Sequence, residues 1–93
     1  MSDDLSLLVD TAVRALKAAG AREVYLFGSA SRGAASPGSD IDLAVSGLPP
    51  ARFFAAMAQA RRIVRRSVDL VDLDEPSPFT EYLKREGELR RVG

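Results

Sequence analysis

Three short β-prone runs alternate with segments of helical periodicity along this chain, and few folds accommodate that order. The runs are EVYLF at residues 23–27, DIDLAV at 40–45 and SVDLVDL at 67–73. Helices are expected over residues 2–20, in the first part of 29–39, over 50–66 and over 79–91. The order α-β-α-β-α-β-α predicts an α/β (α+β) protein, in which helices pack against a small mixed sheet of about three core strands.

The chain length and composition narrow the possible chemistry. Ninety-three residues leave no room for a second core, so we expect residues 1–93 to form a single domain. The absence of cysteine and histidine excludes thiol chemistry, disulfides, tetrahedral zinc sites and imidazole catalysis. Any catalysis must therefore use carboxylates, hydroxyls, arginines or bound ions.

Charge and hydropathy argue against several kinds of partner. Thirteen basic residues balance thirteen acidic residues, so the chain as a whole does not attract nucleic acid or an anionic membrane. The start of the chain lacks the basic region of a signal peptide, and no apolar run is long enough to span a bilayer. These features predict a cytoplasmic protein with no membrane partner.

Aspartates two residues apart suggest a metal site. Asp40 and Asp42 lie in the second β-prone run, and side chains at this spacing point to the same side of a strand. Carboxylates that close repel each other, and a divalent cation such as Mg²⁺ would relieve the repulsion. If the third strand lies beside the second, Asp69 could complete the site and accept a proton from an attacking hydroxyl. Strict alternation puts Asp72 on the opposite face, so we assign it no role.

A Gly-Ser pair at the end of the first β-prone run suggests phosphate binding. Gly28 allows close approach of the backbone to a phosphate, and Ser29 adds a hydroxyl where a helix is expected to start. Arg32 could add a permanent positive charge. Alone, a Gly-Ser pair or an Asp-x-Asp motif is common in turns and on solvated strand faces, but their combination favours a nucleotide site.

The stretch GSASRGAASPGSDIDL, residues 28–43, resembles the G-S-x10-D-x-D signature of the DNA polymerase beta-like nucleotidyltransferase superfamily. In its short form the chain resembles a minimal nucleotidyltransferase, or MNT, domain, and the order of elements agrees over nearly its whole length. Family members often carry a basic residue directly after Gly-Ser; here that residue is Ala30, whereas the later Arg-Gly is kept as Arg32 and Gly33.

The resemblance implies a role for each matching residue. Gly28 and Ser29 would bind the triphosphate of a nucleotide, and Asp40 and Asp42 would coordinate magnesium. Asp69 would complete a carboxylate triad that holds two Mg²⁺ ions. The implied substrate is a nucleoside triphosphate, with ATP favoured.

A stand-alone MNT domain is also similar to the antitoxin of HEPN/MNT toxin-antitoxin pairs. In these pairs the partner is a helical ribonuclease, and some antitoxins transfer AMP from ATP to a tyrosine of the toxin. The resemblance therefore implies transfer of NMP, in the first place AMP from Mg-ATP, to a hydroxyl of a HEPN-type partner. Two alternatives stay open: a non-catalytic antitoxin that neutralises a toxin by complex formation, and an RNA-directed nucleotidyltransferase.

The segment RRIVRR, residues 61–66, bears on the RNA alternative. Its four arginines lie on adjoining rows of the expected helix and could form a basic patch for RNA or an acidic partner. A solvated face near the negative end of the helix dipole explains them equally simply, and we favour that interpretation. Nucleic acid is therefore a possible partner that the sequence does not favour. The identity of the nucleotide, the acceptor, the number of nucleotides transferred and the oligomeric state remain open at this stage.

Overall fold

The computed structural model describes residues 2–28, 41–64, 67–86 and 89–93 of the chain. Its elements are α1 (Ser2–Ala18), β1 (Glu23–Phe27), β2 (Ile41–Ser46), α2 (Pro50–Val64), β3 (Val68–Asp72), α3 (Pro78–Glu86) and β4 (Arg90–Arg91). The described part is thus a mixed α/β structure, which confirms the predicted class. The short helix expected within residues 29–39 lies outside the described residues. Within the described ranges, every helix is too short or too polar to cross a membrane.

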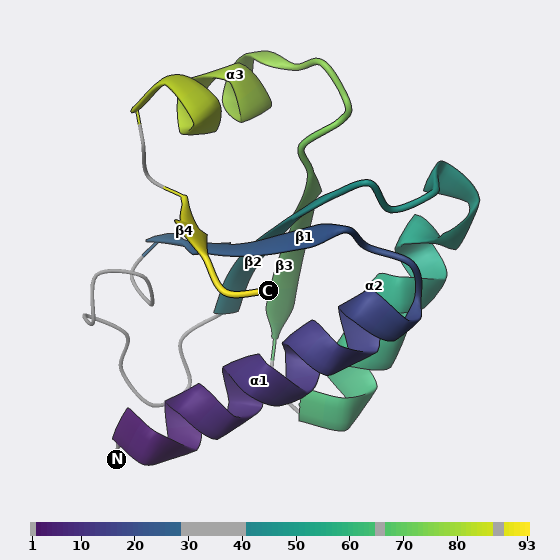
Figure 1. Ribbon diagram of the computed structural model, residues 1–93, viewed down its shortest axis with the longest axis vertical. Helices are drawn as coiled ribbons and strands as arrows, with labels where there is room; N and C mark the ends of the chain where they lie inside the picture. Colours follow the sequence, from purple (N-terminus) through teal and green to yellow (C-terminus); the bar gives the residue numbers. More distant parts are fainter. Residues whose placement is uncertain (1, 29–40, 65–66, 87–88) are drawn as a thin grey trace.

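The sheet has four strands in the order β3-β2-β1-β4 (Figure 1). Strand β1 is antiparallel to both of its neighbours, β2 and β4, whereas β2 and β3 are parallel. Two consecutive parallel strands need a long connection that crosses from one end of the sheet to the other. Helix α2 provides this crossover, and it thereby brings the start of β3 beside the start of β2.

Helices α1 and α2 cover one face of the sheet, and α3 lies over the other (Figure 1). Alternation along β2 separates the two faces: Ile41, Leu43 and Val45 are fully buried in the larger core with α1 and α2. Asp42 and Ala44 point to the face of α3. The Asp42 carboxylate, a predicted metal ligand, therefore faces away from the larger core.

A smaller core holds α3 in place. Phe27, Ala44, Leu73 and Leu83 are buried together in it. The helix begins at Pro78 because Ser77 precedes it as a cap: the Thr80 N–H donates to Ser77 Oγ at 3.1 Å.

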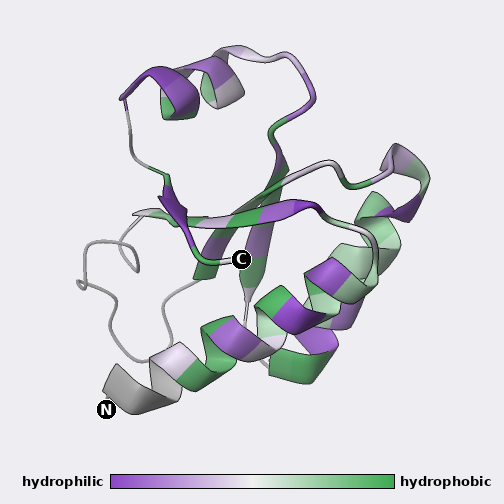
Figure 2. Ribbon diagram, in the orientation of Figure 1, coloured by the Kyte–Doolittle hydropathy of each residue, from purple (hydrophilic) through white to green (hydrophobic). Residues whose placement is uncertain are grey.

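The end of the chain differs from the prediction. A helix was expected up to Arg91, but α3 ends at Glu86, and Arg90 and Arg91 form β4 at the edge of the sheet. They pair with Leu26 and Tyr25 of β1. Figure 2 shows that β4 is hydrophilic, so its side-chain pattern carries no strand signal. Backbone pairing with an otherwise open edge of β1 determines its conformation, and the prediction of helix for these two residues is wrong.

Candidate functional site

Asp42 and Asp69 lie side by side on the face of the sheet that α3 partly covers. They are Cα partners in the parallel pair of β2 and β3, and partners in such a pair are about 4.8 Å apart across the strands. Partners in register point to the same face, so the two side chains project together. The sequence analysis required the third strand to lie beside the second for Asp69 to join Asp42, and β3 does lie beside β2.

Gly28 packs directly against Asp42. Its φ is +72°, in the left-handed region that residues with a Cβ adopt at a cost. A Cβ added to Gly28 would overlap Asp42 Oδ2 and would lie 3.1 Å from Asp42 Cγ. The backbone after β1 therefore approaches the carboxylate as closely as only glycine permits. The sequence predicted close approach to a phosphate at this position, and the structure adds a close approach to Asp42.

The other predicted site residues, Ser29, Arg32 and Asp40, lie outside the described residues. Asp40 directly precedes β2, so its place in a triad with Asp42 and Asp69 remains a prediction. Among the residues that the structure describes, no cluster of three or more acidic side chains is arranged to hold a metal ion.

Asp72, to which the sequence assigned no role, lies on the other face of β3. It pairs with Val45, which is buried against the helices α1 and α2. Its Oδ1 accepts a hydrogen bond from the Asp74 N–H at 3.0 Å, so this carboxylate stabilises the turn after β3. The alternation argument that separated Asp72 from Asp69 agrees with the observed register.

An aromatic pair lies next to Asp42. Phe27 is the Cα partner of Asp42 in the antiparallel pair of β1 and β2. Its ring contacts that of Phe79 on α3 edge to face, with centroids 6.0 Å apart. The sequence analysis missed this contact, because no local pattern brings the start of the last helix to the end of the first strand.

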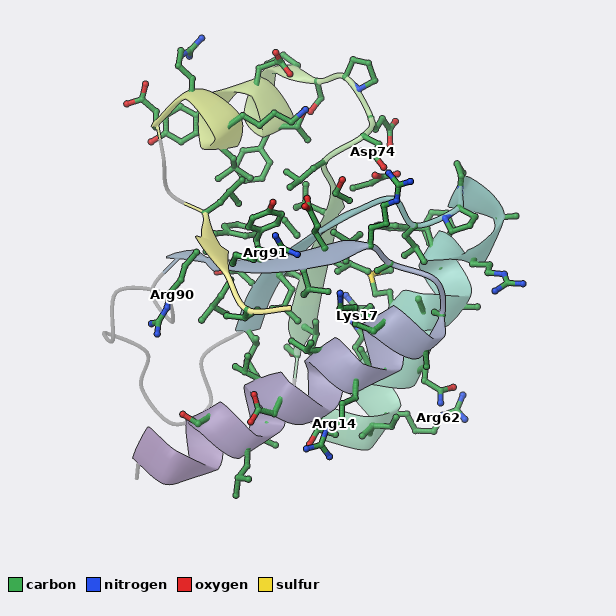
Figure 3. All side chains as sticks on the ribbon, viewed as in Figure 1. Arg14, Lys17, Arg62, Asp74, Arg90 and Arg91 are labelled. Carbon is green, nitrogen blue, oxygen red and sulfur yellow. The ribbon has the colours of Figure 1, made fainter. Side chains whose placement is uncertain are left out.

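Three polar side chains contact one another on the face of β1 that carries Phe27, toward the start of the strand. The Tyr25 hydroxyl donates to Glu23 Oε1 at 2.9 Å, and Arg91 Nη1 lies 3.6 Å from Glu23 Oε2. Arg90 and Arg91 point away from each other on β4 (Figure 3). The hydrogen bond to Glu23, together with burial, raises the pKa of Tyr25, and the positive charge of Arg91 opposes the shift. Alternation within EVYLF could have shown that Glu23, Tyr25 and Phe27 share a face.

A hollow of about 280 Å³ adjoins these polar side chains, and Tyr25, Ser46 and Lys84 are among the residues that line it. Gly28, Asp42 and Asp69 do not belong to its lining. The two aspartates and the hollow are thus different regions of one sheet face. Because the sequence predicts that the aspartates bind Mg²⁺, we place the candidate site at Asp42 and Asp69.

The arginines at the end of α2 have at least one structural role. Arg61 Nε donates to the carbonyl oxygen of Val68 at 2.9 Å and so satisfies an acceptor on the outer edge of β3. Arg62 is exposed, and Figure 3 shows its side chain on the side of α2 that faces away from the sheet. Residues 65–66 lie outside the described ranges. Arg61 therefore supports the interpretation of this segment as part of the fold's surface.

Solved structures share this arrangement. A protein assigned as a minimal nucleotidyltransferase superposes with a TM-score of 0.74 at 22% identity, covering 99% of this chain and 94% of its own. A chain of a toxin-antitoxin complex crystallised with AMP-PNP gives 0.72 at 25% identity, covering 88% and 69%. A chain from a complex of a tri-AMPylated Shewanella oneidensis HEPN toxin with an MNT antitoxin gives 0.68 at 23% identity, covering 98% and 71%.

These structures establish the class of the fold as that of a nucleotidyltransferase, as the sequence predicted. The family model described as polymerase beta, nucleotidyltransferase, matches residues 14–89, which include Gly28, Asp42 and Asp69. This chain belongs to that family. Among curated protein sequences, none gives a significant match.

Proposed function

We propose that this chain transfers a nucleoside monophosphate, in the first place AMP from Mg-ATP, to a hydroxyl of a HEPN-type partner protein. Membership of the nucleotidyltransferase family supports the reaction type. Similarity to a toxin-antitoxin complex with AMP-PNP supports the nucleotide, and similarity to an MNT antitoxin bound to a tri-AMPylated HEPN toxin supports the acceptor.

The observation that carries the proposal is the register between Asp42 and Asp69. Like charges on directly adjacent positions of a sheet destabilise it, and a cation between them would remove the repulsion. Carboxylate oxygens are the ligands that Mg²⁺ prefers, so the donor set fits this ion. We assign Asp40, Asp42 and Asp69 as the residues that would hold two Mg²⁺ ions. Bound Mg²⁺ supplies charge neutralisation at the phosphoryl oxygens.

The residues of the chain then divide the reaction between them. Gly28 and Ser29 bind the triphosphate, and Arg32 adds a positive charge beside it. The acceptor hydroxyl oxygen attacks the α-phosphorus, and a new P–O ester bond forms. The bond from that phosphorus to the oxygen bridging to the β-phosphate breaks, and pyrophosphate leaves. The hydroxyl proton passes to a carboxylate oxygen of Asp69.

The test is intact-protein mass spectrometry of a HEPN-type protein that forms a complex with this chain, after incubation with this chain, Mg²⁺ and ATP. We expect a mass increase of one or more AMP units. Asp69→Asn should abolish the increase, whereas Asp72→Asn should preserve it. The two variants remove the same charge from the same strand, and only the first removes it from the face of Asp42. Equal transfer by Asp69→Asn and the wild type would refute the proposed site.

A second candidate is an antitoxin that neutralises its toxin by binding alone. The similarity to structures of toxin-antitoxin complexes favours it, because complex formation requires no turnover. Neutralisation of the toxin that persists fully in Asp69→Asn, with no AMP transfer by the wild type, would establish this function. An RNA-directed transferase ranks third, and its signature would be an RNA affinity that falls steeply with salt.

A further inference from the structure

We propose that the ring of Phe79 on α3 is a stacking surface for the nucleobase of the donor nucleotide. The inference rests on the proposed function, because it concerns the part of the same nucleotide that lies beyond the phosphates. It assigns recognition of the base to α3 and recognition of the triphosphate to the region around Gly28.

The position of Phe79 relative to the aspartates suggests this role. Phe27 and Asp42 are Cα partners in an antiparallel pair, and the Phe27 and Phe79 ring centroids are 6.0 Å apart. Because paired Cα atoms lie about 4.5–5.5 Å apart and the Phe27 ring stands a few ångström from its own Cα, the Phe79 ring lies at most roughly 15 Å from the Asp42 backbone. A nucleoside triphosphate has a comparable span from the α-phosphate across the sugar to the base. A nucleotide whose phosphates lie at Asp42 therefore has a base within reach of this ring.

Phe79 combines a fixed position with a free surface. Its neighbours on α3, Thr80 and Leu83, are each only 3% exposed and anchor the helix, whereas Phe79 is 49% exposed. The Thr80 hydroxyl also donates to the carbonyl oxygen of Glu75 at 3.0 Å, which fixes the start of the helix. Phe79 is therefore held in place by the fold, with about half of the residue exposed.

The chemistry around Phe79 suits a base better than a phosphate. The charged side chains of α3 neutralise one another: Lys84 lies 3.9 Å from Glu81, and Arg85 lies 3.5 Å from Glu86. The helix thus offers a flat aromatic ring without excess positive charge. Every base has a π-face that can stack on such a ring, and the larger purines offer more area. We therefore expect purine nucleotides to bind more tightly than pyrimidine nucleotides.

The experiment compares binding of ATP with binding of inorganic tripolyphosphate, both with Mg²⁺, by isothermal titration calorimetry. Phe79→Leu keeps an apolar side chain against Phe27 but removes the π-face. We expect it to weaken ATP binding about tenfold and to leave tripolyphosphate binding unchanged, as loss of a stacked base predicts. The control is Tyr82→Leu, which removes an exposed ring from the same helix and should bind both ligands like the wild type.

The possible outcomes separate this inference from the proposed function. Unchanged ATP affinity in Phe79→Leu would overturn the inference, as would an equal loss of tripolyphosphate affinity. Unchanged ATP affinity with loss of the HEPN complex would assign the ring to the partner surface instead. Base-dependent ATP binding without AMP transfer would support the inference and refute the transferase. If Phe79→Leu unfolds, Phe79→Trp decides the question, since it should bind ATP at least as tightly as the wild type.

Discussion

Replacing Gly28 by alanine should reduce the proposed AMP transfer far more than it reduces stability. At a φ of +72°, a residue with a Cβ costs roughly 1–2 kcal/mol. Alanine also lowers the conformational entropy of the unfolded chain, which stabilises the folded state by about 0.4–1 kcal/mol. We therefore expect the free energy of unfolding to fall by about 1 kcal/mol in total. The new Cβ would overlap Asp42 Oδ2, which forces the carboxylate to rotate away. Misplacing a reacting group by about 1 Å can lower a rate about 100-fold, and we expect a loss of that size.

Gly47→Ala is the matched control for this prediction. Gly47 has a φ of +78°, and a Cβ there would meet side-chain carbons of Arg22 at 2.7–2.9 Å and no atom of Asp42. It should destabilise the protein at least as much as Gly28→Ala and keep AMP transfer. Urea unfolding gives the stabilities, and mass spectrometry of the proposed HEPN-type partner over time gives the rates. Transfer by folded Gly28→Ala at the wild-type rate would refute the argument that Gly28 positions Asp42.

Two further predictions concern hydrogen bonds that the structure shows. Arg61→Ala removes the hydrogen bond to the Val68 carbonyl oxygen and should lower the free energy of urea unfolding by about 0.5–1.5 kcal/mol. Arg62→Ala, at an exposed position, should change it by less than about 0.5 kcal/mol. Equal effects of the two substitutions would contradict the structural role of Arg61. The pKa of Tyr25 is raised above its ordinary value of 10.0, chiefly by its hydrogen bond to Glu23, so its contribution to stability is complete below that pH and is lost as the pH rises through the raised value. Tyr25→Phe should therefore flatten the decline of the unfolding free energy above about pH 10, and an unchanged decline would show that Tyr25 does not cause it.

Local pattern was sufficient for most elements. The prediction for β1 agrees with the structure residue for residue, and the predicted start of α2 at Pro50 is the observed one. The residues of each element are sufficient to favour its conformation. EVYLF consists mainly of side chains that favour strands, and the fixed φ of Pro50 suits the first turn of a helix. The charged end of the chain was different. The helix predicted there is present as α3. Arg90 and Arg91, however, form β4 because they pair with the open edge of β1, and a local sequence pattern cannot reveal this pairing.

The sequence by itself predicted the kinds of groups at the candidate site: a glycine after a strand, an acid on the next strand with a second acid two residues before it, and a third acid on a later strand. It could not determine that Asp42 and Asp69 are in register, that Gly28 packs against Asp42, or that Phe79 reaches Phe27. Each of these contacts joins segments that are distant along the chain. Their geometry depends on the α2 crossover and on the docking of α3, because strand register and helix docking are set by burial of side chains across the whole core.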